Sequence, residues 1–435
     1  MQKRLKVAAT GDALFVADIP KEYDGDLKVI SEYMGDCDVR ITNLETNISK
    51  FGEFPSAYSG GTWLNTEPEV FDDLTKFGFN YYGTANNHCM DYSYHAMLST
   101  IDELNKRGLA HSGTGRSLAE AGAPAVIDAN NGQKVAIIAV TAEFETASKA
   151  GYETDTLQAR PGVNYIGREV YYPADKETVD QLKVIADKTG VNGLRNLSIK
   201  GGFILPDADG LFNFGGLKFC YDGSKKRSEC NTKDKERIIQ SIKEAKKSYD
   251  YVFILIHSHD IQIDSHEQVP DYLEELSHAC IDAGASAMIG GGTHQLRPVE
   301  IYKGCPIFYS LGDFIYQGMR VPILPADFMI KYGLDVNATA WEGLMARSKN
   351  GKIGLQAFKE NFLTVLPKMQ FENGKLISLE MLPIVAGFDR KDKLNGLPYH
   401  AKGEESEEIF NVLTRLSTPY GTKLVIENDV IKLSL

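Results

Sequence analysis

Long apolar runs are absent from this sequence. No window comes near the roughly 18 consecutive apolar residues that a membrane-spanning helix needs. The N-terminal stretch MQKRLKVAATGD has basic residues, but the apolar stretch after them is too short for the hydrophobic region of a secretory signal peptide. We therefore expect no membrane span and a cytoplasmic location.

Cysteine and positive charge are also scarce. The six cysteines are scattered without a Cys-x-x-Cys pair, which argues against a thiolate zinc site and predicts reduced thiols. Lys and Arg number 47 against 59 Asp and Glu, and the resulting net charge of −12 argues against duplex nucleic acid as a partner. A small molecule or a peptide is the expected substrate, and the oligomeric state is left open.

Hydrophobic residues, by contrast, make up 43% of the 435 residues, enough for a sizeable core. Apolar runs typical of strands occupy 5–12, 37–46, 79–88, 134–144, 250–260, 285–295 and 305–316. Apolar residues at helical spacing occupy 67–79, 94–108, 235–248 and 271–285. This alternation predicts an α/β fold whose sheet core is buried and largely parallel.

Two regions depart from the alternation. Residues 146–235 have many Gly, Asp, Lys and Tyr and weak periodicity, so we interpret them as an inserted, lid-like region that covers the site. Residues 341–435 contain alternating runs on both sides of Asn373-Gly374, which is a hairpin signal. We therefore expect one catalytic domain over 1–340, including the insertion, with a β-rich extension over 341–435 packed on it.

Polar side chains follow several of the predicted strands. They are carboxylate, amide and imidazole groups: Asp12, Glu45, Asn87, His88, His257, His259 and His294. In α/β sheets ligands bind beyond the carboxyl ends of the strands, so we expect these groups to converge there. Oxygen and imidazole donors suit Mn, Fe or Zn better than Ca. The sequence thus predicts a centre for one or two divalent metal ions.

Taken singly, each of these residues has a simpler structural explanation. An Asp such as Asp12 often caps a turn or a helix, and an Asn such as Asn87 often supplies turn geometry. A His after an apolar run can be a core residue bonded to the backbone. Arg116, in a Gly-rich turn, either binds an anion or completes the turn, and Arg297 either borders the site or lies on the surface. The ordered set as a whole favours function.

The spelling and order of the motifs resemble one family. They are the pair GD at 11–12, NLET, ANNHCMDYS, GTGRSLAEAGAPAVI and IGGGTHQLRPVEIYKGCPIFYSLGDFIY. These motifs are similar to those of the CapA-type capsule and poly-γ-glutamate synthesis proteins, which are similar in turn to the calcineurin-like metallophosphoesterases. The resemblance covers 5–145 and 250–320 well, the last hundred residues loosely and 146–235 hardly at all. It implies a four-layer αββα sandwich of two mixed sheets flanked by helices.

The resemblance also implies roles for individual residues. The metal ligands would be Asp12, Glu45, Asn87, His257 and His294, with Glu45 as the bridging carboxylate. His88 would be the proton donor, with Asp91 as its orienting partner. Two metal ions about 3.5–4 Å apart can activate a bridging water and hold phosphoryl or carbonyl oxygens. We expect substrate contacts from Arg116, His259, Arg297 and Asp313.

Three positions depart from the family pattern. Leu14 stands where the phosphoesterases have a histidine, and Gly292 stands where a further imidazole is usual. A single well-bound metal ion is therefore an alternative to two, and His259 is a candidate replacement for the missing imidazole. Asp313 stands where Asn is usual, and its negative charge would disfavour a phosphate dianion.

Three functions fit these observations. The first is a metal-dependent hydrolase acting on a phosphoester or on an amide or peptide-like bond, such as that of poly-γ-glutamate. The second is a metal-assisted epimerase or isomerase of peptides or amino acids, in which Asp12 and His294 are the acid-base pair that moves an α-proton. The third is a non-catalytic member of the family that binds a polymer.

Overall fold

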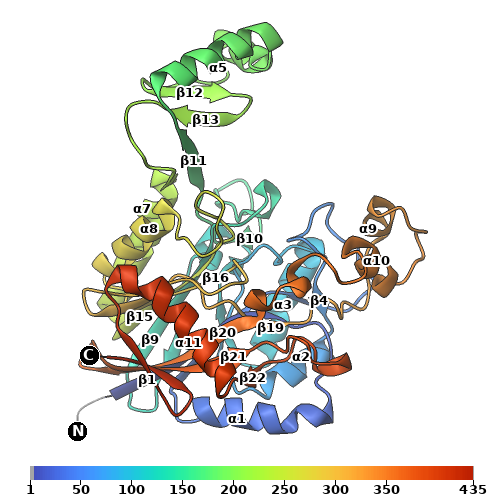
Figure 1. Cartoon of the computed structure of the whole chain (residues 1–435), viewed down its shortest axis with the longest axis vertical. Helices are drawn as coiled ribbons and strands as arrows, with labels where there is room; N and C mark the ends of the chain where they lie inside the picture. Colours follow the sequence, from blue (N-terminus) through green and yellow to red (C-terminus); the bar gives the residue numbers. More distant parts are fainter. Residues whose placement is uncertain (1–3, 435) are drawn as a thin grey trace.

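The chain folds into four layers, in which two sheets lie face to face between helices (Figure 1). The computed structural model describes residues 4–434. The buried cluster between the sheets includes Val7 and Ile41 from one sheet and Phe253 and Leu255 from the other. The metallophosphoesterase-like αββα sandwich that the family resemblance implies is therefore confirmed.

The first sheet has ten strands and is centred on β1. Its path runs β23-β24-β21-β20-β1-β2-β5-β6, while β19 pairs with β1 and β22 pairs with β21. β1 is parallel to β2 and β19 but antiparallel to β20, so the sheet is mixed. The bounds are β1 (Arg4–Leu14), β2 (Val39–Leu44), β5 (Tyr81–Gly83), β6 (Ala110–Ser112), β19 (Asp313–Tyr316), β20 (Leu363–Glu372), β21 (Lys375–Val385), β22 (Tyr399–His400), β23 (Leu424–Glu427) and β24 (Val430–Leu433).

The second sheet has six strands in the order β17-β18-β16-β15-β9-β8. Its four central strands are parallel, and its edge strands β8 and β17 are antiparallel to their neighbours. The buried core of the sheet is therefore parallel, as predicted. The bounds are β8 (Ala125–Asp128), β9 (Lys134–Thr141), β15 (Tyr251–His257), β16 (Ala287–Gly291), β17 (Val299–Tyr302) and β18 (Cys305–Phe308).

Helices cover the outer faces of both sheets. Ile30 of α1 (Asp24–Met34) and Phe71 of α2 (Pro68–Thr75) are buried against the first sheet. Ile242 of α7 (Thr232–Ser248) and Leu276 of α8 (Asp271–Asp282) are buried against the second. The remaining elements of the body are α3 (Ser93–Lys106), α4 (Leu118–Ala121), α9 (Ala326–Lys331), α10 (Ala340–Arg347), α11 (Glu404–Ser417), β3 (Asn47–Ile48), β4 (Asn65–Thr66), β7 (Thr114–Gly115) and β10 (Gly162–Val163).

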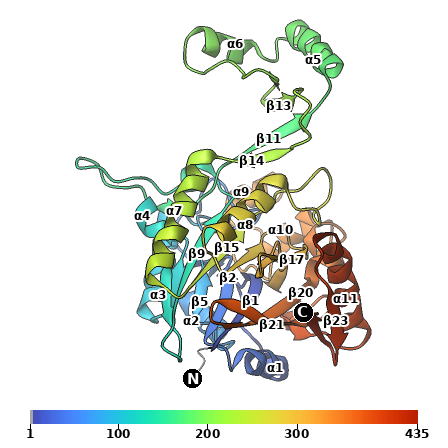
Figure 2. The same cartoon turned by 90° about the vertical axis from the view of Figure 1, so that its left-hand side faces the viewer.

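The inserted region forms an arm, which we define as residues 168–230. Its four-stranded sheet has the order β12-β13-β11-β14, and the upper part of the arm projects away from the body (Figures 1 and 2). Its elements are β11 (Arg168–Pro173), α5 (Lys176–Thr189), α6 (Gly193–Lys200), β12 (Leu211–Phe214), β13 (Leu217–Cys220) and β14 (Ser228–Cys230). Residues 146–167 are outside the arm: β10 pairs with β7 of the body, while residues 152–158 are exposed. The covering of the site by this region stays a prediction.

One feature differs from the expected elements. The predicted strand over 305–316 is two strands in different sheets, β18 and β19, because the chain turns at Tyr309–Gly312 and Gly312 has φ +74°. The residues after 340 include β20, which pairs directly with β1. None of the helices within residues 4–434 combines the length and the hydropathy that crossing a membrane would take.

Candidate metal centre

The chemically active side chains meet at one edge of the two sheets. Asp12 lies near the end of β1, Glu45 follows β2, and His257 is the last residue of β15. The structure brings these three together with the others that follow strands β5, β15 and β16: Asn87, His88, His259 and His294. The ends of parallel strands from both sheets therefore build the site.

Asp12 is held in its ionised form. Asn43 Nδ2 donates to Oδ1 of Asp12 at 2.6 Å, and the backbone N–H of Gly292 donates to Oδ2 at 2.6 Å. Burial alone would raise the pKa of Asp12, but the charge of His257 and the hydrogen bonds from His257, Asn43 and Gly292 lower it. An ionised carboxylate is the form that binds a cation.

The glycine run before His294 leaves room for this carboxylate. A Cβ atom on Gly291 would lie 2.4 Å from Oδ1 of Asp12, and one on Gly290 would lie 2.4 Å from the backbone oxygen of Tyr309. Gly292 has φ +106° and His294 has φ +60°. Residues other than glycine rarely adopt such positive φ angles. The run therefore lets β16 approach Asp12 closely and then turn to present His294.

Glu45 lies at the centre of the site and has unmet bonding capacity. It is 0% exposed, and neither carboxylate oxygen has a hydrogen-bond partner within residues 4–434. His257 Nε2 lies 3.4 Å from Oε1 and His88 Nε2 lies 3.9 Å from it. Burial, together with the negative charges of Asp12, Asp313 and Asp91, raises the pKa of Glu45 well above its usual value. A buried carboxylate without partners is costly unless a cation compensates it.

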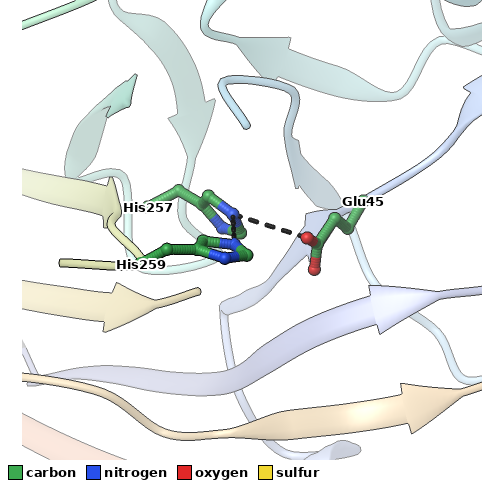
Figure 3. A group of neighbouring side chains, drawn as sticks. All are labelled: Glu45, His257 and His259. Atoms are coloured by element: carbon green, nitrogen blue, oxygen red, sulfur yellow. Dashed lines mark hydrogen bonds and ion pairs between the residues drawn. The ribbon is translucent and has the colours of Figure 1, made fainter. Parts of the chain in front are cut away.

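Two imidazoles lie beside Glu45 (Figure 3). His257 Nε2 lies 3.0 Å from His259 Nε2 and 2.8 Å from the amide oxygen of Asn87. The possible ligand atoms of Glu45, His257 and His259 all lie within 4.8 Å of one another. Burial and the neighbouring histidines lower the pKa of His259 well below its usual value, so the imidazole is neutral and has a lone pair to offer.

A second group of carboxylates shares Glu45 with the first. The nearest oxygens of Asp12, Glu45 and Asp313 also lie within 4.8 Å of one another. Glu45 thus belongs to both groups, which is the arrangement that a bridging carboxylate requires. The donors present, with their orphaned buried oxygens, fit one or two divalent transition-metal ions.

Two histidines are each oriented by a buried carboxylate. His88 Nδ1 lies 2.6 Å from Asp91 Oδ2, and His294 Nδ1 lies 2.9 Å from Asp313 Oδ2. Burial raises the pKa of Asp91 and of Asp313, although the paired histidines oppose this. Since each Nδ1 is taken, the free Nε2 atom is the one available for other contacts. Asp313 is fully buried, and its carboxylate contacts His294 and does not reach solvent.

The other predicted substrate contacts lie in different settings. Arg116 is not brought to the cluster, because its guanidinium pairs with Asp102 at 2.7 Å and with Glu120 at 3.3 Å. Arg297 is 1% exposed and donates to the backbone oxygens of Asp260 and His266, so it holds the loop that follows His259. Burial lowers the pKa of Arg297 to about 10.

The departures from the family pattern also have places in the structure. Leu14 lines a small cavity beside His88 and His294, where it supplies an apolar wall. His259 reaches His257 because β15 ends at His257 and the chain turns there. Because Gly292 supplies no imidazole, His259 is the additional imidazole that lies beside His257.

Sequence reasoning missed the asparagines that hold the site together. Asn43 Nδ2 donates to Asp12 and also lies 3.2 Å from His257 Nδ1. Asn86 Oδ1 accepts from the backbone N–H of His88 at 3.1 Å, and its Nδ2 donates to the Leu44 carbonyl at 2.8 Å. Both stand inside quoted motifs, directly beside predicted ligands, and that position was the available signal.

Comparisons with known proteins cover most of the chain. The family model described as bacterial capsule synthesis protein PGA_cap matches residues 6–318. The uncharacterized protein y4sH of Sinorhizobium fredii is 30% identical over 98% of this chain and 92% of its own length. A probable polyglutamine synthesis accessory protein of Mycobacterium tuberculosis is 23% identical, covering 90% of this chain and 76% of its own. The PGA biosynthesis protein CapA of Bacillus subtilis is 27% identical over 58% and 47% respectively. The motifs, the fold and these matches agree, and the chain belongs to the PGA_cap family of bacterial capsule synthesis proteins.

Proposed function

We propose that this chain is a divalent-metal-dependent hydrolase within that family. The observation that carries the proposal is Glu45, whose two buried oxygens have no partner among the described residues and face imidazole donors. Evolved cores seldom leave such a carboxylate uncompensated, and a cation between these donors would compensate it. The residues that would hold the metal are Asp12, Glu45, Asn87, His257, His259 and His294.

The surrounding residues have the chemistry that bond cleavage needs. A bound divalent ion would supply Lewis acidity and a more acidic water molecule. His88 Nε2 is the free nitrogen of an imidazole whose other nitrogen is fixed by Asp91, so this atom can hand a proton to a leaving group. Asn87 Nδ2 donates to the Gly60 carbonyl at 2.9 Å, which leaves its amide oxygen directed at His257 and the site.

The substrate bond that we favour is of the amide or peptide type. Relatives of this chain bear names that refer to polyglutamine synthesis and to PGA biosynthesis, which supports an amide-linked polymer. The buried carboxyl groups of Asp12, Glu45, Asp91 and Asp313 crowd one small volume and would disfavour a phosphate dianion more than a neutral amide. A phosphoester remains the alternative for the assay to decide.

The test combines metal analysis with turnover. Elemental analysis of the purified protein should find Mn, Fe or Zn, and hydrolysis of γ-glutamyl peptides should depend on that metal. His88→Asn should keep the metal content and lower kcat by about 10²–10⁴-fold, the usual contribution of a general acid. His294→Ala should lose metal and turnover together.

Three results would overturn the hydrolase. The first is a protein that binds none of these metals. The second is incorporation of deuterium from D₂O at an α-carbon without cleavage, which would identify an epimerase that uses Asp12 and His294. The third is a metal-loaded protein that neither cleaves nor exchanges, yet binds the polymer, which would identify the non-catalytic member.

A further inference from the structure

A cavity of about 80 Å³ opens directly beside the candidate metal centre. His88 and His294 form one part of its wall, and Tyr316, Gly60 and Arg347 form others. Both histidines use Nδ1 for a carboxylate partner, so Nε2 is the nitrogen that His294 would offer to the metal ion and that His88 would offer to the reacting bond. The cavity is therefore where a group attached to the reacting bond would lie.

Arg347 brings an unneutralised positive charge to this cavity. It is the last residue of α10, and its Nη1 donates to the Gly61 carbonyl and to Thr62 Oγ1. Its guanidinium carbon also lies 6.0 Å from the centre of the Phe328 ring. Within residues 4–434, no carboxylate oxygen lies within 4.0 Å of its guanidinium nitrogens, as one does for Arg116 or Arg168. The guanidinium is thus oriented by neutral groups, and its other donors stay available.

Gly60, which also lines the cavity, lies close against two residues of the candidate metal centre. A Cβ atom on Gly60 would lie 2.6 Å from Asn87 Nδ2 and 2.7 Å from the His88 ring, so only glycine lets the chain pass here. The ring of Tyr316 also lines the cavity, and its centre lies 6.3 Å from the centre of the His294 ring. The loop that carries Gly60 and the end of α10 are joined by the Arg347 hydrogen bonds, so both walls are held in one geometry.

We infer that this cavity is a carboxylate-binding subsite in which Arg347 pairs with an acidic group of the substrate. The inference rests on the proposed function, because it names the class of substrate as a peptide or polymer with a carboxylate close to the reacting amide. Arg presents a planar fork that matches a carboxylate. A single guanidinium suits a monoanion, whereas a phosphate dianion would add charge next to the buried carboxyl groups of Asp12, Glu45 and Asp313.

The test measures binding of matched probes to the purified, metal-containing protein. The probes are γ-glutamylglutamate, the same dipeptide with its carboxylates amidated, and phenyl phosphate, followed by calorimetry or, where turnover occurs, by KM and kcat. Wild type should prefer the dipeptide. Arg347→Met should weaken binding of the dipeptide by about 10–100-fold, as loss of a charged hydrogen bond does, leave binding of the triamide, in which all three carboxylates are amidated, unchanged, and alter KM more than kcat. The affinity of Arg347→Lys for the dipeptide should fall between that of wild type and that of Arg347→Met.

Controls separate a lost contact from a lost fold. Arg415→Met removes an exposed arginine that pairs with Glu267 at 2.6 Å, and it should change nothing. The melting temperature of Arg347→Met should match that of wild type. If it does not, the binding comparison is made with Arg347→Lys instead. The inference is wrong if wild type binds none of the probes at millimolar concentration, if it binds dipeptide and triamide equally, or if only the binding of phenyl phosphate depends on Arg347. Carboxylate preference that depends on Arg347 in a protein without hydrolysis would uphold the subsite and reject the hydrolase.

Discussion

At the scale of single residues, Glu45 makes opposite contributions with and without a metal ion. In the metal-free protein its burial is unfavourable, and replacement by the neutral isostere in Glu45→Gln should raise the melting temperature by a few degrees. The same change removes the shared ligand, so metal affinity should fall by at least about 100-fold. Differential scanning fluorimetry with and without chelator, together with elemental analysis, measures both effects. A variant that is less stable without metal but keeps normal metal content would contradict this account.

Gly291 is a second residue whose effect can be calculated from contacts. In Gly291→Ala the new methyl group would fall 2.4 Å and 2.6 Å from the two oxygens of Asp12. The carboxylate must then leave Asn43, so we expect metal content to fall at least about 10-fold and the free energy of unfolding to drop by about 1–3 kcal/mol. Gly25→Ala is the matched control, because a methyl group there meets nothing within 4 Å. It should leave the metal content as it is.

The candidate site was predictable from residue types but not from residue partners. Carboxylate, amide and imidazole groups after apolar runs identified the cluster because parallel strands end at one edge. The partners of His88 and His294 are a different matter. Asp91 is three residues from His88 and was predicted beside it, whereas Asp313 reaches His294 only because β19 joins β1 in the other sheet. Arg347 could not be foreseen, because no local sequence pattern indicates that it shares a cavity with His88 and His294.

At the scale of elements, one ion pair links the base of the arm to the loop that carries His259. Arg168 Nε on β11 lies 2.5 Å from Oδ2 of Asp260, the residue after His259. Tyr272 on α8 donates to the same oxygen at 2.6 Å. The loop that carries His259 is thus held between the arm and the second sheet, which makes Arg168 a positioning residue.

Removing this link should loosen the loop without unfolding the body. Arg168→Met should cost about 1.5–3 kcal/mol in local stability and lower metal affinity by about 10-fold, since it frees Asp260 and with it His259. Hydrogen exchange of residues 257–262 and metal titration report the two effects. Arg195→Met is the control, because Arg195 pairs with Asp207 inside the arm. Equal effects of both substitutions would refute the positioning role.

Local sequence patterns predicted most of the strands and helices of the sandwich. They did not predict which strands pair when those strands are far apart in the sequence. The predicted runs at 134–144 and 250–260 became β9 and β15 because each is long, β-branched and buried. The single run at 305–316 divided because Gly312 allows a positive φ, and sequence periodicity does not report such a turn. The pairing of β20 with β1 joins residues more than three hundred positions apart, which no window of sequence can indicate.

At the scale of the whole molecule, the C-terminal strands are part of the same sheet as β1. β20 forms a continuous antiparallel ladder with β1, in which Arg4 pairs with Glu372 at one end and Ala8 pairs with Lys368 at the other. Three side chains of β20, those of Val365, Met369 and Phe371, are buried between the sheets. A chain ending at residue 340 would expose that edge of β1 and an apolar face. We expect it to aggregate or to melt without a cooperative transition, as calorimetry and circular dichroism would show. Cooperative unfolding of this shortened chain would mean that the sheet closes without β20.

The arm should behave in the opposite way, since it shares little core with the body. α6 buries none of its residues, and α5 buries only Val179 and Ala186. Tyr171 N–H donates to the Arg227 carbonyl at 2.7 Å, so an Asn-Gly turn can replace residues 172–226 and close the β11–β14 hairpin. We expect this shortened protein to keep its metal, to melt within about 5 °C of wild type and to retain turnover of a dipeptide, because Arg168 and Asp260 stay in place. Loss of metal on this replacement would show that the distal arm, and not only its base, supports the site.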